Sequence, residues 1–172
     1  PECAGGGGPG TLTSALLLVL RLALAVVFLY AAYQKLRSPE AAQNFLLAVK
    51  SFGIVPEHLL KVVTFLVPWT EVVTGIALVA GLWTRAAATL LLATIVVFIY
   101  GIWDVLSRNA KVECGCFGDL HWPCGSVVAM CHVYRNVGLA VAALILVAFG
   151  GGKFGLDGLW RSMTHAARAH PA

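Results

Sequence analysis

The stretch "VTGIALVAGLWTRAAATLLLATIVVFIYGIW", residues 73–103, decides the fold class. It joins two long apolar runs through a short turn at Gly81 to Trp83. An α-helix rises about 1.5 Å per residue, so each run is long enough to cross about 30 Å of hydrocarbon. So short a connection fits only a tight antiparallel hairpin. Trp83, Tyr100 and Trp103 suit the aromatic belts at the two membrane surfaces.

The composition of the 172-residue chain extends this pattern. It is 59% hydrophobic and 12% charged, whereas soluble proteins average about 25% charged residues. The apolar runs long enough to span a bilayer are 12–33, 57–81, 83–103 and 126–149. We therefore expect an all-α membrane protein, with an antiparallel four-transmembrane-helix bundle over residues 12–149 in contact with lipid. Because its basic residues are scattered, the net charge of +4 does not indicate nucleic acid as a partner.

Segments outside the spans predict short interfacial helices. Ser38 suits an N-cap, Pro39 the first helical position and Gly53 a terminator. The apolar residues between them share one helical face, which favours an amphipathic helix on the bilayer surface over a span extended into solvent. Residues 150–172 show similar spacing and are expected to form an interfacial tail. Residues 1–11 are expected to be disordered.

Three charges fall near the middle of predicted spans: Arg21, Glu71 and Arg135. An Arg or Asp at the centre of a membrane helix costs about 2.5–3.5 kcal/mol on insertion scales. We expect them to form an intramembrane polar cluster in which Glu71 pairs with one or both arginines. The cluster either only holds the helices in register, or its spare guanidinium attracts an anion such as a thiolate or a quinone oxygen.

The fourth predicted span carries a stripe of residues at helical spacing. Its members are Cys124, Val128, Cys131, Arg135, Gly138 and Ala142. Gly138 and Ala142 are expected to allow close helix contact. If both cysteines were helical, Cys124 and Cys131 would be about 10 Å apart along the axis, too far for a disulfide. Cys131 is therefore predicted to be a packing residue, and His132 a satisfied interior histidine.

Three cysteines gather in the polar interval "KVECGCFGDLHWPCGSVV", residues 111–128. Thiol–disulfide exchange needs a thiolate, an access path and a second sulfur that resolves the mixed disulfide. Cys114 and Cys116 supply two sulfurs, separated by one glycine. Cys124 is a candidate third member, because the nearby helix start favours its thiolate. It is expected to bridge Cys116 or Cys114.

Two other chemistries remain open for this interval. Cys114, Cys116, His121 and Cys124 form a chemically reasonable zinc set, although their spacing is tighter than in ordinary zinc modules. A purely structural disulfide is the other alternative. We favour redox chemistry over both and predict no metal.

Four segments resemble the MauE and DoxX membrane proteins: "RLALAVVFLYAAYQKL" (21–36), "VPWTEVVTGIALVAG" (67–81), "CGCFG" (114–118) and "YRN" (134–136). The "CGCFG" motif points to the MauE branch. The resemblance implies a four-helix membrane bundle and a role in methylamine dehydrogenase maturation, through disulfide formation with a thioredoxin-like partner. It also implies that Cys114 and Cys116 are the redox pair and that Arg21, Glu71 and Arg135 match the family's intramembrane polar positions. The arrangement is similar to quinone-linked disulfide-forming proteins of the DsbB and vitamin K epoxide reductase type.

Together, the residues and the resemblance favour a membrane thiol–disulfide oxidoreductase that exchanges its Cys-Gly-Cys pair with a thioredoxin-like protein or a protein thiol substrate. No tightly bound cofactor is expected, and a quinone is a candidate electron acceptor. The alternative is a non-catalytic subunit or assembly factor of a larger membrane complex, with a structural disulfide.

The chain is expected to be a multi-pass protein of the cell (inner) membrane. Disulfide chemistry places the cysteine loop on the periplasmic or extracellular side and the termini in the cytoplasm. The positive-inside rule favours the reverse orientation by only six basic residues to four.

Overall fold

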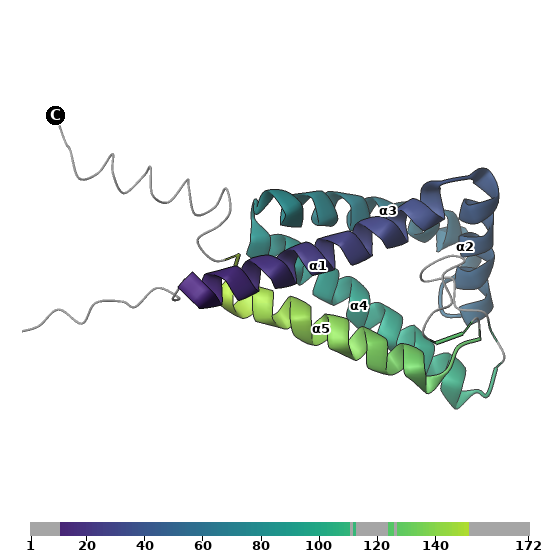
Figure 1. Ribbon diagram of the computed structural model, residues 1–172. Coiled ribbons are helices and arrows are strands. Elements are labelled where there is room, and N and C mark those ends of the chain that lie inside the picture. The colour runs from purple at the N-terminus through teal and green to yellow at the C-terminus, as the bar shows by residue number, and fades with distance from the viewer. Residues whose placement is uncertain (1–10, 111, 113–123, 126, 152–172) are drawn as a thin grey trace, which may run out of the picture.

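The computed structural model describes residues 11–110, 112, 124–125 and 127–151. These residues form five helices (Figure 1): α1 (Thr11–Leu36), α2 (Pro39–Phe52), α3 (Glu57–Ala80), α4 (Thr84–Ser107) and α5 (Met130–Phe149). All but α2 are long and apolar enough to cross a membrane. The predicted all-α, four-span membrane bundle is thus confirmed. The expectations for residues 1–10 and 152–172 lie outside the described residues.

The four long helices form two antiparallel pairs. α1 packs along α3, and α4 packs along α5. Gly81 and Trp83 both adopt positive φ angles, of 67° and 47°, and their left-handed turn joins α3 to α4 as the predicted hairpin. Figure 1 shows the two pairs close together at one end and spreading apart toward the other. α2 runs across the wider end and contacts α1, α3 and α4.

Small residues allow the close approach of α1 and α3. A methyl group added at Gly75 would lie 2.7 Å from Cγ of Leu29, a distance that real side chains cannot hold. Ala25 beside it is fully buried. Close contact through small residues is the usual way that membrane helices associate, because lipid offers no hydrophobic drive for helix pairing.

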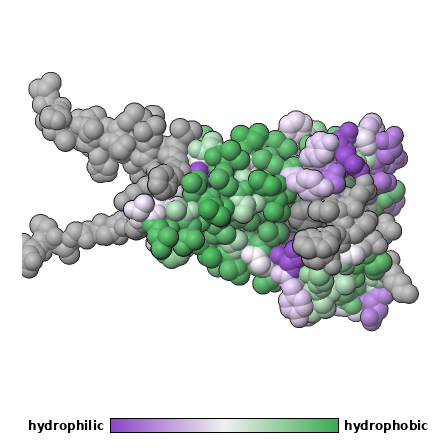
Figure 2. Space-filling model, viewed as in Figure 1, coloured by the Kyte–Doolittle hydropathy of each residue, from purple (hydrophilic) through white to green (hydrophobic). Residues whose placement is uncertain are grey.

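The surface of the bundle is apolar along its length, as expected for contact with lipid. Figure 2 shows hydrophobic residues over the middle of the molecule and hydrophilic residues gathered at the end that carries α2. Trp83 and Trp103 are largely exposed and lie twenty residues apart along the chain, which is about 30 Å of helix. This separation matches one hydrocarbon thickness, so both rings suit the predicted interfacial belts.

The predicted helix between the first two spans is present as α2. The hydroxyl of Ser38 accepts a hydrogen bond from the Ala41 N–H, and Gly53 ends the helix at φ 70°. Its apolar face packs on the bundle, since Phe45 is buried and the Phe52 ring lies against Gly101 of α4. Its placement at the bilayer surface stays a prediction.

Candidate functional site at the wide end of the bundle

A disulfide joins Cys124 to Cys131 at the start of α5, with Cα atoms 5.5 Å apart. The prediction that Cys131 only fills space, and that Cys124 bridges Cys114 or Cys116, is therefore wrong. The reason lies in the helix boundary. α5 begins at Met130 rather than near residue 126, so Cys124 precedes the helix in a turn and the chain can fold back. Both cysteines are half-buried.

The start of α5 is also held by backbone and core contacts. The Val128 N–H donates to the carbonyl oxygen of Val112 at 2.9 Å. Val112 and Val128 are buried together with Ile102 and Val105 of α4. The two ends of the intervening polar interval thus meet beside α5, one through Val112 and the other through Cys124.

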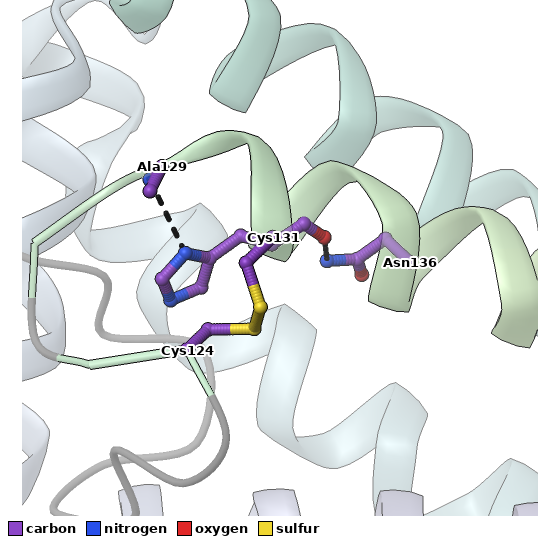
Figure 3. The surroundings of a disulfide bond; sticks show 5 residues. Cys124, Ala129, Cys131 and Asn136 are labelled. Carbon is purple, nitrogen blue, oxygen red and sulfur yellow. Dashed lines mark hydrogen bonds between the residues drawn. A yellow bond between two sulfur atoms is a disulfide. The ribbon is translucent and has the colours of Figure 1, made fainter.

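The buried side chain of His132 caps the N-terminus of α5. Its Nδ1 accepts a hydrogen bond from the Ala129 N–H at 3.2 Å, which satisfies one of the free amides at the end of a helix. The Asn136 side chain donates to the His132 carbonyl at 2.8 Å. Figure 3 shows the disulfide joining Cys124, which precedes α5, to Cys131 on its first turn. The expectation of a satisfied interior histidine is confirmed.

The predicted stripe coincides only in part with the contact face of α5, since Val128 is buried and Ala142 packs against the core. The buried residues of the helix are His132, Asn136, Ala143 and Leu146, one position away from the predicted stripe. Gly138 is exposed, and no described atom lies within 4 Å of a methyl group added there. Arg135 is half-buried in the second turn. Gly138 therefore does not serve as the predicted helix contact.

Glu71 forms a buried ion pair, but its partner is Lys35 rather than an arginine. Nζ of Lys35 lies 2.8 Å from both carboxylate oxygens, and the two side chains are 1% and 3% exposed. The Phe45 ring of α2 covers the ammonium, with its centroid 5.2 Å from Nζ. The predicted pairing of Glu71 with Arg21 or Arg135 is thus corrected. α1 continues to Leu36, three residues beyond the predicted span, and carries Lys35 to the face of α3.

Arg21 lies at the narrow end of the bundle. A methyl group added at Gly151 would be 3.1 Å from its Nη1 and 2.7 Å from Oγ1 of Thr84, so these groups converge. Nearby, Arg85 donates to the Ala148 carbonyl at the end of α5. The α1 helix is staggered and begins well before this level. Arg21 therefore sits level with helix ends, not at the centre of the bundle.

The alternative zinc set loses a ligand, because the sulfur of Cys124 is bonded to Cys131. Cys114, Cys116 and His121 lie outside the described residues. Within the described part of the chain, no group of three or more His, Cys, Asp or Glu side chains could hold a metal ion.

Comparison with known proteins fits this bundle. The family model for methylamine utilisation protein MauE matches residues 13–149. The chain belongs to the MauE family. A methylamine utilization protein MauE of Paracoccus denitrificans is 32% identical over 132 residues, covering 76% of this chain and 67% of the relative. No solved structure matches the chain.

The functional-site residue that sequence reasoning missed in this MauE-family chain is Lys35. A signal for it was present. Buried residues of α1 recur at alternating spacings of four and three, the pattern of one helix face: Leu17, Arg21, Leu24, Phe28, Ala31 and Lys35. Extending the apolar stripe by one turn places Lys35 on the same buried face as Arg21. Ending the predicted span at residue 33 hid this placement.

Proposed function

We propose that this MauE-family membrane protein serves methylamine utilisation as a thiol–disulfide oxidoreductase, with Cys114 and Cys116 as the exchanging pair. The observation that carries the proposal is the convergence of Val112 and Cys124 at the start of α5. In the sequence, Cys114 and Cys116 lie between these two residues. The exchanging pair is thus assigned to the interval whose two flanking residues are fixed at the wide, polar end of the bundle.

The proposed reaction is a two-step dithiol–disulfide exchange. A thiolate of a thioredoxin-like partner attacks the Cys114–Cys116 disulfide, and a mixed disulfide forms while the other sulfur leaves as a thiolate. The partner's second thiol then attacks the mixed disulfide. The partner leaves oxidised and Cys114 and Cys116 are reduced. A membrane quinone, which takes up the two electrons and two protons as quinol, is the proposed acceptor that restores the disulfide.

An oxidising compartment favours this chemistry, so we place the wide end of the bundle on the periplasmic or extracellular side. The burial of Lys35 against Glu71 supports this orientation. It removes one basic residue from the side that the positive-inside rule would assign to the cytoplasm. The small charge excess that favours the opposite topology therefore becomes smaller.

A trapping experiment tests the proposal. In a Cys3→Ser background, which removes the cysteine near the N-terminus, a Cys116→Ser or Cys114→Ser variant keeps one exchanging thiol but lacks the resolving sulfur. Its thiolate should displace 2-nitro-5-thiobenzoate from a single-cysteine thioredoxin that carries this leaving group, and the resulting mixed disulfide should accumulate. Non-reducing gels and peptide mapping would detect it. The absence of a mixed disulfide on the remaining Cys114 or Cys116 in both single variants would refute the assignment.

A second function, a non-catalytic subunit or assembly factor of a larger membrane complex, is favoured by one observation. The Cys124–Cys131 bond links the turn before α5 to the helix. This structural link does not require that the bond ever exchanges with another thiol. Under this alternative no cysteine of the native protein would exchange with a dithiol. Thiol mapping after treatment with dithiothreitol, with and without denaturant, separates the two functions.

A further inference from the structure

We propose that the Cys124–Cys131 disulfide is itself exchange-active and accepts electrons from a protein dithiol. This inference rests on the proposed function, since it assumes thiol chemistry at the wide end of the bundle. It goes further by adding a second redox pair, formed between the turn before α5 and the first turn of α5.

The fold at the start of α5 does not depend on the Cys124–Cys131 bond. The start of α5 is held by the Val128 hydrogen bond to Val112, by the burial of Val128 against α4 and by His132 on the Ala129 amide. These contacts remain when the sulfurs separate. A structural disulfide usually joins segments that little else connects, whereas this one duplicates existing contacts.

The Cys124–Cys131 disulfide is accessible to an attacking thiolate. Both cysteines are half-buried rather than enclosed, and Gly125 next to Cys124 is exposed. Gly125 adopts φ 77°, and no described atom lies within 4 Å of a methyl group added there. Because Cys124 is only half-buried beside the exposed Gly125, a thiolate can approach its side of the bond.

Cys131 is the better leaving group of the two cysteines. Cys131 is the second residue of α5, where the free amides and the helix dipole favour negative charge. Arg135 follows four residues later, and residues at this spacing have Cβ atoms about 5–6 Å apart. A thiolate on Cys131 is therefore better stabilised than one on Cys124. Because the better-stabilised thiolate leaves, the attacked sulfur is that of Cys124.

The step balances with a dithiol as reductant. The partner thiolate bonds to Sγ of Cys124, the Cys124–Cys131 bond breaks and Cys131 leaves as the thiolate. The partner's second thiol then displaces Cys124, which takes up a proton. The partner is oxidised by two electrons, and Cys124 and Cys131 are reduced. Reoxidation uses a quinone or another disulfide.

The test isolates the pair in a Cys3→Ser/Cys114→Ser/Cys116→Ser protein in detergent. Reduced dithiothreitol should reduce the Cys124–Cys131 bond completely without denaturant, as measured by maleimide gel shift and peptide mapping, while the melting temperature of the protein changes little. A bond that stays oxidised until denaturant is added would overturn the proposal.

A matched variant separates this result from the proposed function. The Cys3→Ser/Cys124→Ser/Cys131→Ser protein keeps only Cys114 and Cys116. Exchange in this variant together with an inert Cys124–Cys131 pair would overturn the present inference and leave the proposed function standing. Exchange by Cys124 and Cys131 together with an inert Cys114–Cys116 pair would overturn the assignment of Cys114 and Cys116 alone.

The roles of the two sulfurs are tested with a monothiol. When the isolated oxidised pair is treated with reduced glutathione and the released thiol is alkylated with N-ethylmaleimide, the glutathione mixed disulfide should form several-fold more on Cys124 than on Cys131. Arg135→Gln should slow the reaction several-fold, and Arg135→Lys should restore most of the rate. A mixed disulfide found mainly on Cys131, or an equal rate in Arg135→Gln, would overturn the assigned roles.

Discussion

Breaking the Lys35–Glu71 ion pair should destabilise the protein more than any other single change of charge. Nζ of Lys35 contacts both oxygens of Glu71 at 2.8 Å, with side chains 1% and 3% exposed. Opposite charges about 4 Å apart attract by about 4 kcal/mol at an effective dielectric of 20. Removing one partner of a buried pair typically costs about 3–5 kcal/mol, because the remaining charge is left unpaired. We expect Glu71→Leu to lose that amount.

The same chain supplies a matched control. Lys50 and Glu57 form a pair with similar geometry, 3.0 Å apart, but their side chains are 55% and 81% exposed. Exposed pairs contribute about 0–1 kcal/mol, so Glu57→Leu should change stability little. The double variant Lys35→Met/Glu71→Leu replaces both buried charges by apolar groups and should recover most of the loss.

The measurement is reversible unfolding of the detergent-solubilised protein by SDS, followed by circular dichroism. The wild-type protein, Lys35→Met, Glu71→Leu and the double variant form a double-mutant cycle that isolates the coupling between Lys35 and Glu71. A loss below about 1 kcal/mol in Glu71→Leu, which is the range of an exposed pair, would refute the reasoning. So would a double variant as unstable as the sum of its two single variants.

Three further predictions use the same unfolding measurement. Gly75→Ala would clash with α1 and should cost about 1–3 kcal/mol of stability. Gly138→Ala, where the described surroundings are open, should be neutral or stabilise the protein by up to about 1 kcal/mol. Equal effects of the two substitutions would contradict the packing of α1 on α3. Phe45→Ala should cost about 3–5 kcal/mol, because its ring is buried over the ion pair, and Leu47→Ala, at a position 55% exposed, should cost far less. Ser38→Ala removes the α2 N-cap and should cost about 1 kcal/mol, and an unchanged stability would show that the cap contributes nothing.

The spans and the α2 helix could be predicted because their signals are local. Long apolar runs identify membrane helices by length alone. Ser38, Pro39 and Gly53 mark the two ends of α2 through side-chain and backbone geometry that neighbouring residues determine. The end of α1 and the start of α5 lie in apolar or weakly polar sequence, where no capping residue marks the limit of the helix. The predicted limits of α1 and α5 were therefore wrong by about one turn.

Those small boundary errors account for the errors in the candidate site. One turn added to α1 moves Lys35 from a loop onto the face that meets Glu71. One turn removed from the start of α5 frees Cys124 from the helix and allows the bond to Cys131. Both contacts join segments whose relative placement depends on where a helix stops. Periodicity gives the face of a residue only after the limits of the helix are known.

The role of α2 follows from the contacts at its two ends. Phe45 covers the Lys35 ammonium on the α1–α3 side, while the carbonyl of Phe52 accepts a hydrogen bond from Arg108 at the end of α4. The two helix pairs spread apart at this end (Figure 1), so α2 connects what the long helices leave separate. Its apolar face packs on protein through Phe45 and Phe52, whereas Leu47 is largely exposed. A helix fixed at both ends in this way keeps the wide end of the bundle in one arrangement, which a partner protein that docks beside the Cys124–Cys131 bond would require.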